Sequence, residues 1–205
     1  MADPDTPFRE EDADPDPLRQ FERWFAEATQ AGTLQPEAAA VASATPDGRP
    51  SVRMVLVKQA DENGFVFYSN YESRKGGELA TNPRAALLFH WQRLGRQVRI
   101  EGPVKRTTRE ESLAYAHSRP RGSQLSALAS PQSRPVADRF WLEQRVAELD
   151  ERHAGGDVPL SESWGGFRLT PERFEFWQHR QSRLHDRLLY TPDPAGGWRV
   201  ERLAP

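Results

Sequence analysis

Two segments of the chain combine cations with apolar or aromatic residues. In the first, Arg53-Met54-Val55-Leu56-Val57-Lys58, an arginine and a lysine bracket aliphatic residues. The second, from Phe176 to Arg187, carries Trp177, Arg183, His185 and Arg187. Burying such cations without partners is costly, and the neighbouring sequence has no excess of carboxylates. The two segments therefore predict a site for a bound anion.

Four cations form the first candidate anion site: Arg53, Lys58, Arg74 and Lys75. A guanidinium matches a phosphate bidentately, and an ammonium adds a compact charge beside it. The triplet beginning at Ser73 also starts a predicted helix, where free backbone N–H groups favour an anion. The alternative is a set of solvated surface charges.

A second candidate site follows Tyr115. Tyr115 and Arg119 are four residues apart and share a helix face, and Ser123 adds a hydroxyl after the break imposed by Pro120. The three side chains could hold a second phosphate, although Arg119 could instead interact with the helix dipole. The turn Ala129–Ser133 carries an amide and a hydroxyl that could contact a polar ring edge.

The C-terminal candidates all have odd residue numbers, so they would alternate with other residues along a strand. On one strand, the odd-numbered Trp177, Arg183, His185 and Arg187 would project to the same side and form a cationic, aromatic surface. The alternative is a solvent-facing edge strand, but such strands usually mix both charge signs. Taken alone, His185 is better explained as a hydrogen-bonded surface residue than as a catalyst.

Composition narrows the function classes. The chain has 205 residues, which suits one domain, and 28 Lys+Arg against 30 Asp+Glu leave a net charge of −2. This balance argues against nucleic-acid binding, and no apolar run is long enough to span a membrane. The lack of cysteine excludes thiolate chemistry and is consistent with a cytoplasmic protein. The five histidines lack zinc-type spacing, so no metal site is predicted.

The sequence pattern predicts a disordered acidic tail over residues 1–15 and a single domain over residues 16–205. Helices are expected at 17–32, 73–81, 108–118 and 136–153, from capping residues and apolar periodicity. Strands are expected at 38–44, 51–58, 65–69, 85–91, 97–106, 164–170, 173–178 and 187–203, the last with a turn at Gly196-Gly197. Short hairpin turns join the early strands, so the predicted fold is mainly β, an antiparallel barrel with peripheral α-helices.

Eight motifs in this order resemble the pyridoxine/pyridoxamine 5'-phosphate oxidase family, over nearly everything after residue 17. They are Arg53–Lys58, Tyr68-Ser69-Asn70, Ser73-Arg74-Lys75, Gly95-Arg96-Gln97-Val98, Ser118-Arg119-Pro120-Arg121, Pro131-Gln132-Ser133, Trp164-Gly165-Gly166-Phe167 and Arg183-Leu184-His185-Asp186-Arg187. The resemblance implies an FMN-binding split β-barrel that works as a homodimer, with the flavin at the interface.

The resemblance also implies roles for individual residues. The FMN contacts would be Arg53, Met54, Val55, Leu56, Val57, Lys58, Tyr68, Ser69, Arg74 and Lys75, completed from the partner subunit by Gln97, Gln132, Ser133, Trp177 and Arg187. The substrate phosphate would be bound by Lys58, Tyr115, Arg119 and Ser123. The catalytic pair, Arg183 and His185, would contact the substrate ring.

The implied reaction is oxidation of pyridoxine or pyridoxamine 5'-phosphate to pyridoxal 5'-phosphate. A hydride would pass from the 4' carbon to FMN, and the amine substrate would pass through an imine. Dioxygen would then reoxidise the flavin and release hydrogen peroxide. The protein would supply positioning and positive charge.

Several positions depart from the family pattern. The acidic tail replaces a basic, tyrosine-containing arm that covers the substrate in some members. Gln35 replaces an acidic residue before Pro36, and His179-Arg180 falls where glycine is common. Two other readings remain open: a sister FMN oxidase with a larger aromatic substrate, as in phenazine pathways, and a non-catalytic module that binds FMN or pyridoxal phosphate. Tyr115, Arg119 and Ser123 favour a phosphorylated substrate.

Overall fold

The computed structural model describes residues 6–205. Its nine strands are β1 (Ala38–Ala44), β2 (Pro50–Asp61), β3 (Gly64–Asn70), β4 (Arg84–Trp91), β5 (Arg96–Arg106), β6 (Trp164–Leu169), β7 (Arg173–Gln178), β8 (Asp186–Pro192) and β9 (Trp198–Arg202). Its helices are α1 (Pro17–Gln30), α2 (Arg74–Thr81), α3 (Arg109–Ser118), α4 (Arg121–Ala129) and α5 (Arg139–Arg152). Three 3-10 segments also form, η1 (Glu10–Asp12), η2 (Gln92–Leu94) and η3 (Gln181–Arg183).

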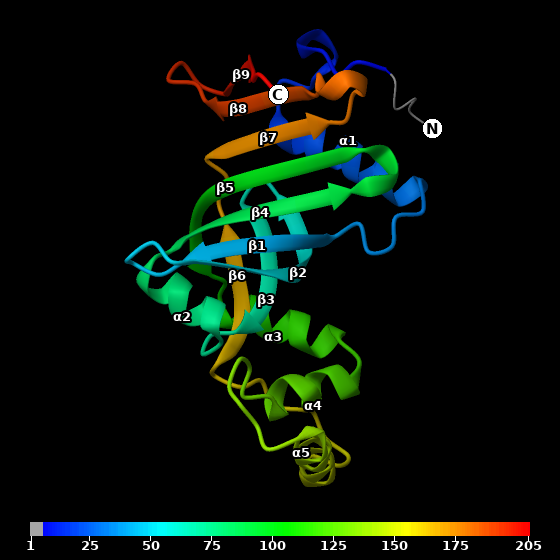
Figure 1. The fold of residues 1–205 in the computed structure, drawn as a ribbon. Coiled ribbons are helices and arrows are strands. Elements are labelled where there is room, and N and C mark those ends of the chain that lie inside the picture. The colour runs from blue at the N-terminus through cyan, green and yellow to red at the C-terminus, as the bar shows by residue number, and fades with distance from the viewer. Residues whose placement is uncertain (1–5) are drawn as a thin grey trace.

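All the strand pairs are antiparallel, in the order β4-β1-β2-β3-β6-β5-β7-β8-β9. A further pairing of β4 with β5 closes six of these strands into a barrel, and β7 to β9 extend the sheet beyond it (Figure 1). Closure removes the exposed edges of the barrel strands. The prediction of an antiparallel barrel with peripheral helices is therefore confirmed.

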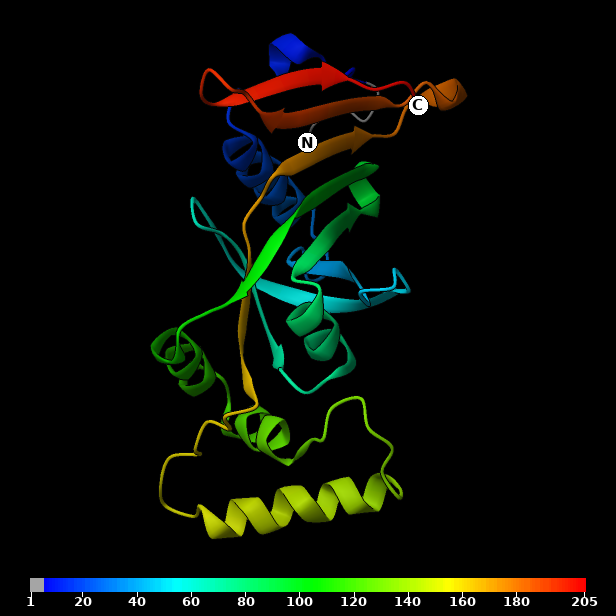
Figure 2. The same cartoon turned by 90° about the vertical axis from the view of Figure 1, so that its left-hand side faces the viewer.

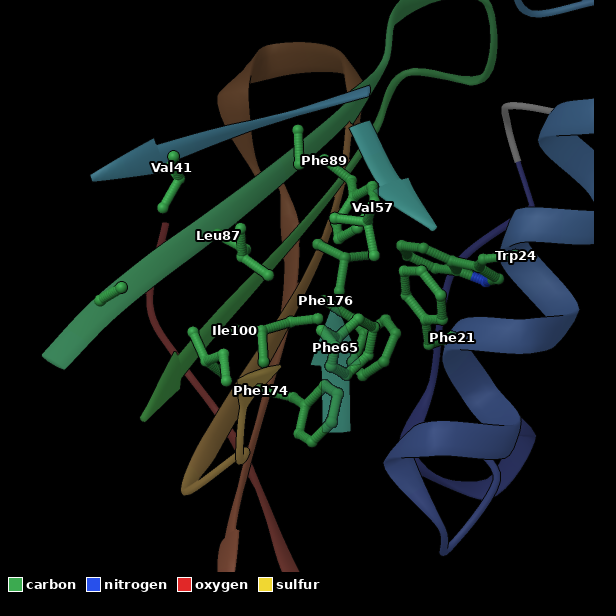
Figure 3. Close-up of a cluster of buried hydrophobic side chains, with 14 of the residues drawn as sticks. Phe21, Trp24, Val41, Val57, Phe65, Leu87, Phe89, Ile100, Phe174 and Phe176 are labelled. Atoms are coloured by element: carbon green, nitrogen blue, oxygen red, sulfur yellow. The ribbon is translucent and has the colours of Figure 1, made fainter. Parts of the chain in front are cut away.

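The barrel core combines aromatic and aliphatic side chains, and α1 packs against it (Figure 3). The side chain of Asp16 caps α1 by accepting a hydrogen bond from Leu18 N, and Pro17 occupies the first turn. The ring of Phe21 lies 5.0 Å from that of Phe65 and 4.9 Å from that of Phe89. These contacts attach the predicted amphipathic helix to the barrel.

Helices α3, α4 and α5 lie at the opposite end of the molecule from β8 and β9 (Figures 1 and 2). Leu125, Ala129, Leu149 and Val158 form a small separate core there. The sequence reading did not predict α4, because Pro120 was interpreted only as a break. In the structure Pro120 is the residue before the first turn of α4, a place that a proline tolerates well. None of the helices within residues 6–205 has the length and apolar character of a membrane span.

The N-terminal segment differs from the predicted tail. Residues 1–5 lie outside the described residues, but residues 6–15 are ordered and include η1. The side chain of Phe8 is buried, with its ring 4.9 Å from that of Trp24. A single buried aromatic ring, together with backbone hydrogen bonds, orders a segment whose composition otherwise predicts disorder.

The C-terminal candidates do not share one strand. Trp177 lies on β7 and Arg187 on β8, and the loop between these strands contains Arg183 and His185. The parity argument is therefore wrong, because the chain reverses direction between the two halves of the motif. The segment predicted as strand 187–203 forms β8 and β9, joined by a turn with positive φ at Gly196 and Gly197.

Candidate functional site

A cation-lined cavity of about 520 Å³ lies where β2, the start of α2 and the 131–133 turn meet. Its lining includes Arg53, Arg74, Lys75, Gln132 and Ser133. The structure thus brings together cations from two motifs that are separate in sequence. The N-terminal end of α2 also lies here, capped by the side chain of Ser73.

Both arginines of this cavity pair with one buried carboxylate, Glu78. Glu78 lies 3.0 Å from Arg74 Nε and 3.4 Å from Arg53 Nη2. It also accepts hydrogen bonds from Ser43 (2.6 Å) and Ser51 (2.5 Å). Burial alone would raise the pKa of Glu78, but the hydrogen bonds and Arg53 together lower it to about 2.

The sequence near these cations has no excess of carboxylates, but the folded chain supplies carboxylate partners to three of them. Glu78 pairs with Arg53 from 25 residues away in sequence. Similarly, Lys58 Nζ lies 3.2 Å from Glu37 Oε1. Partners at such separations come from the folded barrel and cannot be found by inspecting the neighbouring sequence.

Lys75 is the buried cation of the cavity, and it contacts neutral oxygens. Its Nζ donates to Ser69 Oγ at 2.6 Å, to Gln132 Oε1 at 3.3 Å and to Ser73 Oγ at 3.4 Å. Burial, and then the positive charge of Arg53, lower the pKa of Lys75 to about 8. With Lys75 protonated, three cations face one carboxylate, so two positive charges remain to attract an anion.

A second cavity, of about 410 Å³, adjoins the first and is partly aromatic. Tyr68 stacks on Tyr115 with ring centroids 3.8 Å apart, and Trp164 lies parallel to both rings. The guanidinium of Arg119 lies 5.2 Å from the centroid of Trp164. Burial raises the pKa of Tyr68, which keeps its hydroxyl protonated. The cavity therefore offers flat apolar surface with a cation at its side.

Lys58, which was predicted to join Arg53, Arg74 and Lys75, lines this second cavity and not the first. The register of β2 against β3 shifts between Val57 and Gln59, so Lys58 lies at a β-bulge. Bulges change the direction of a side chain, and here the bulge allows Lys58 to line the cavity. Met54 and Leu56, from the same strand, are exposed, whereas Val55 and Val57 face inward to the core.

Ser123 lies in the first turn of α4 and is half-buried. The α4 residues that line the second cavity are Ser126 and Ala127. Because Ser126 follows Ser123 by three positions, the two hydroxyls share one helix face. Ser123 is therefore near the cavity but is not among the residues that line it.

Gln132 connects the two cavities and lines both. Its Oε1 accepts from Ser69 Oγ at 2.8 Å, in addition to Lys75. Gln132 and Ser133 thus lie beside Lys75 of their own chain. This differs from the expectation that the partner subunit supplies them.

A second group of predicted residues lies across three neighbouring strands. In register, Gln97 of β5 is opposite Trp177 of β7, which is opposite Arg187 of β8. Arg187 donates Nε and Nη2 to Glu175 at 2.8 Å and Nη1 to the carbonyl of Ala204 at 2.7 Å. The guanidinium is therefore fixed within its own sheet.

The loop after β7 carries the predicted catalytic pair. His185 is half-buried, with its ring 4.6 Å from Trp177, and its Nδ1 accepts a hydrogen bond from Arg180 N at 3.1 Å. A neutral imidazole held in this way carries its hydrogen on Nε2. Arg183 is exposed and has a left-handed backbone, φ 61°, directly after Ser182 with φ 56°.

The structure does not bring the two groups together within one chain. The Arg183 and His185 loop joins β7 and β8, whereas Tyr115 and Arg119 belong to the α3–α4 end of the molecule (Figures 1 and 2). The candidate residues therefore form two groups, at opposite ends of the chain. Gln35, one of the unusual positions, is exposed in the turn before β1, with φ 53°.

Two residues of the candidate site were given no role from the sequence. Glu78 follows Arg74 by four positions in α2, a spacing that suits a helical ion pair. Trp164 precedes the Gly165-Gly166 pair, and its parallel stacking with the tyrosines becomes apparent only once β3 pairs with β6. The i,i+4 spacing of Arg74 and Glu78 can be recognised in the sequence. The stacking of Trp164 depends on tertiary structure and cannot.

Comparison with known proteins gives consistent matches. Residues 25–153 match the model of the family described as pyridoxamine 5'-phosphate oxidase. Residues 164–205 match the pyridoxine 5'-phosphate oxidase C-terminal dimerisation region.

Two curated relatives carry the name pyridoxine/pyridoxamine 5'-phosphate oxidase. The one from Rubrobacter xylanophilus is 59% identical over 196 residues, 96% of this chain and 90% of that protein. The other, from Ralstonia nicotianae and numbered 1 in its name, is 57% identical over 194 residues, 95% of this chain and 91% of that protein.

Solved structures extend the comparison. PhzG from Burkholderia lata, in complex with tetrahydrophenazine-1-carboxylic acid, is 34% identical with a TM-score of 0.91, covering 98% of both chains. An FMN-binding protein from Nostoc punctiforme, 16% identical with a TM-score of 0.70 over 90% of this chain and 97% of that chain, shares the fold. The two family models, the curated relatives and the fold of the solved structures all point to the same family. The chain belongs to the pyridoxamine 5'-phosphate oxidase family.

Proposed function

We propose that this protein oxidises pyridoxine 5'-phosphate and pyridoxamine 5'-phosphate to pyridoxal 5'-phosphate. When bound, FMN supplies the hydride acceptor, and dioxygen reoxidises it to give hydrogen peroxide. The observation that carries the proposal is a pair of adjoining cavities, each with its own cations, which suits two phosphorylated ligands side by side. The names of the relatives support the same activity.

The first cavity fits the phosphate of FMN. Lys75 is a buried ammonium with neutral hydrogen-bond acceptors, and Arg53 and Arg74 are oriented by Glu78. A phosphate dianion would neutralise the remaining positive charge. Gln132 and Ser133 would add neutral hydrogen-bonding groups at the boundary with the second cavity.

The second cavity fits the phosphate and ring of the substrate. Lys58, Tyr115 and Arg119 line it and would bind the phosphate, with Ser123 in the adjacent turn of α4. Trp164 would hold Arg119 by its cation–π contact.

A homodimer would complete each site. The match to the dimerisation region over residues 164–205 supports this assembly. The partner subunit would then contribute Gln97, Trp177 and Arg187 to the flavin, and Arg183 and His185 to the substrate ring. Two partial sites at opposite ends of one chain suit a twofold assembly, because each pair of ends then forms one complete site.

His185 would act as a hydrogen-bond donor. Because Nδ1 is occupied by the backbone of Arg180, the neutral ring can offer the hydrogen on Nε2 to the 4' hydroxyl or amine of the substrate. This contact would orient the 4' carbon, while Arg183 would clamp the ring. Positioning is then the main contribution of the protein to the hydride transfer.

An absorbance assay tests the proposal. Protein loaded with FMN is mixed with each 5'-phosphorylated vitamer, and the aldehyde product and peroxide are followed. We expect stoichiometric peroxide and aldehyde with at least one vitamer. A yellow protein that forms neither product would overturn the proposal.

The similarity to PhzG favours one second candidate, oxidation of a tetrahydrophenazine carboxylic acid. The same assay with tetrahydrophenazine-1-carboxylic acid distinguishes the two activities. Because Lys58 and Arg119 line the substrate cavity, we expect the phosphorylated vitamers to give the higher kcat/KM. The opposite ranking would assign the chain to the second activity.

A further inference from the structure

The N-terminal arm, defined as residues 6–12, contacts the sheet beside the loop that carries the predicted catalytic pair. The side chain of Phe8 is buried, with its ring 4.9 Å from that of Trp24 and 6.4 Å from that of Phe176 of β7. Figures 1 and 2 show η1, which belongs to the arm, lying against β9. The acidic segment is therefore anchored to the C-terminal sheet.

Hydrogen bonds attach the arm to both strands that flank this loop. Phe8 N donates to Asp186 Oδ2 at 3.0 Å, at the first residue of β8. Gln178 Nε2, at the last residue of β7, donates to the carbonyl of Thr6 at 2.8 Å. Gln178 and Asp186 are opposite each other in the β7–β8 ladder. The arm thus binds the hairpin at the point where its loop begins.

Asp186 is the centre of these contacts. Besides Phe8 N, its carboxylate accepts from Arg202 Nη1 at 2.8 Å and lies 3.7 Å from Arg180 Nε. Arg202 in turn donates to the carbonyl of Phe8 at 2.9 Å and pairs with Glu10 at 2.8 Å. One carboxylate therefore connects the arm, β9 and the loop.

The loop needs such support, because its backbone is unfavourable. Ser182 and Arg183 both have left-handed φ values, 56° and 61°, and neither is glycine. Arg183 and Leu184 are exposed, so side-chain packing does little to hold them. Contacts at the C-terminal end of the loop, where Asp186 lies, therefore help to hold it, together with the hydrogen bond from Arg180 N to His185 Nδ1.

We propose that the N-terminal arm is a latch that holds the 179–185 loop in its substrate-binding geometry, with Asp186 as the positioning residue. The buried Phe8 side chain anchors the arm, and Asp186 accepts a hydrogen bond from Phe8 N. The loop then holds Arg183 and His185 in fixed positions. In this protein, an acidic arm supports the substrate loop from the sheet behind it. This inference rests on the proposed role of Arg183 and His185 in binding the substrate ring.

The test uses the full-length, FMN-loaded protein with the variants Phe8→Ala, Asp186→Ala and Asp186→Asn. Glu11→Ala is the matched control, because Glu11 belongs to the arm, is exposed and pairs with Arg9. Three properties are measured for each variant. They are the amide hydrogen exchange of residues 179–185, the FMN affinity by flavin fluorescence, and kcat and KM for pyridoxamine 5'-phosphate.

We expect Phe8→Ala and Asp186→Ala to accelerate exchange in the loop by about tenfold or more, since a hydrogen bond to a charged group is lost or loosened. KM should rise and kcat should fall in both, while FMN affinity stays within about twofold of the parent. Asp186→Asn keeps an acceptor for Phe8 N and should recover part of the loss. Glu11→Ala should match the parent protein.

Unchanged loop exchange and unchanged KM in both Phe8→Ala and Asp186→Ala would overturn the latch. If Phe8→Ala fails to fold, Asp186→Ala and Asp186→Asn still decide the outcome. Hydrogen exchange does not depend on turnover. An inactive parent protein would therefore count against the proposed function, whereas the exchange data would still decide whether the arm holds the loop.

Discussion

At the scale of single residues, Lys75 carries the clearest pH prediction. The pKa of Lys75 is lowered from 10.5 to about 8, mainly by burial, in the FMN-free protein. A bound dianion favours the protonated lysine, so FMN affinity should be constant below about pH 8. It should then fall by up to about tenfold per pH unit above it. Fluorescence titrations between pH 7 and 9.5 measure this change.

Lys75→Arg supplies the control, because a guanidinium stays protonated throughout this range. Its FMN affinity should lose the pH dependence, whatever its absolute value. The stability of the FMN-free parent should change in the opposite direction. Between about pH 8 and pH 10.5, Lys75 is protonated in the unfolded chain but largely neutral in the folded one. The free energy of unfolding therefore increases as the pH rises through this range. An affinity that does not change across pH 8 would contradict the assignment of Lys75 to the phosphate.

Glu78 carries the second residue-scale prediction. Its carboxylate is 5% exposed and accepts from the buried Ser43, the half-buried Ser51 and the exposed Arg74, so Glu78→Ala leaves two serine hydroxyls and the partly buried Arg53 without this acceptor. We expect the free energy of unfolding to fall by about 2 kcal/mol or more, since each unsatisfied buried group costs about 1–3 kcal/mol. Denaturant unfolding measures this loss. Glu78→Gln, which keeps one acceptor oxygen, should lose clearly less, and equal losses would contradict the hydrogen-bond explanation.

Residue types alone predicted the cations of the site but not how they are held. Arg53, Arg74 and Lys75 line one cavity, as their chemistry suggested. Glu78 pairs with Arg53, and Glu37 pairs with Lys58, from other elements, whereas the Arg74–Glu78 pair lies within α2. Local composition cannot find the partners of Arg53 and Lys58, because the fold of the barrel creates these contacts.

At the scale of elements, strands β1 to β5 and helix α1 were readable from sequence because each has a clear apolar period and turn or cap residues. The β7–β8 loop was not, since left-handed backbone at Ser182 and Arg183 carries no glycine signal. Helix α4 was missed for a similar reason, because Pro120 both ends one helical segment and precedes the next. A proline can therefore mark the end of one helix or the start of the next, and the sequence alone does not distinguish the two.

The loop conformation gives an element-scale prediction. Ser182→Val places a β-branched side chain at φ 56°, which should cost about 1–2 kcal/mol and shift the loop away from its folded geometry. We expect KM for the vitamer substrate to rise while FMN affinity stays unchanged. Ser182→Gly, which accepts positive φ, is the control and should keep the parent KM. Equal kinetics for Val and Gly would show that the loop geometry has no part in substrate binding.

At the scale of the whole molecule, the alternating strands predicted an antiparallel barrel, and the short connection between β4 and β5 suits a hairpin. No local pattern indicated that β1 pairs with β4, or that β6 pairs with both β3 and β5. The separation of the candidate residues between two ends of the chain was equally hidden, because motif order in sequence does not give distance in space. The resemblance predicted a dimer with a shared site. The Arg183 loop lies far from Tyr115 and Arg119 within one chain, so these residues could meet only between chains.

Subunit mixing tests the shared site directly. Arg119→Leu removes a substrate contact at one end of the chain, and Arg183→Leu removes one at the other, so each homodimer should bind FMN but turn over slowly. In a mixed dimer, one of the two sites combines the intact Arg119 of one chain with the intact Arg183 of its partner. Random exchange should therefore restore about a quarter of the parent activity, because half of the dimers are mixed and each has one complete site. Mixing two preparations of the same variant controls for the procedure, and a mixture that stays as slow as its parts would mean that each chain carries its own complete site.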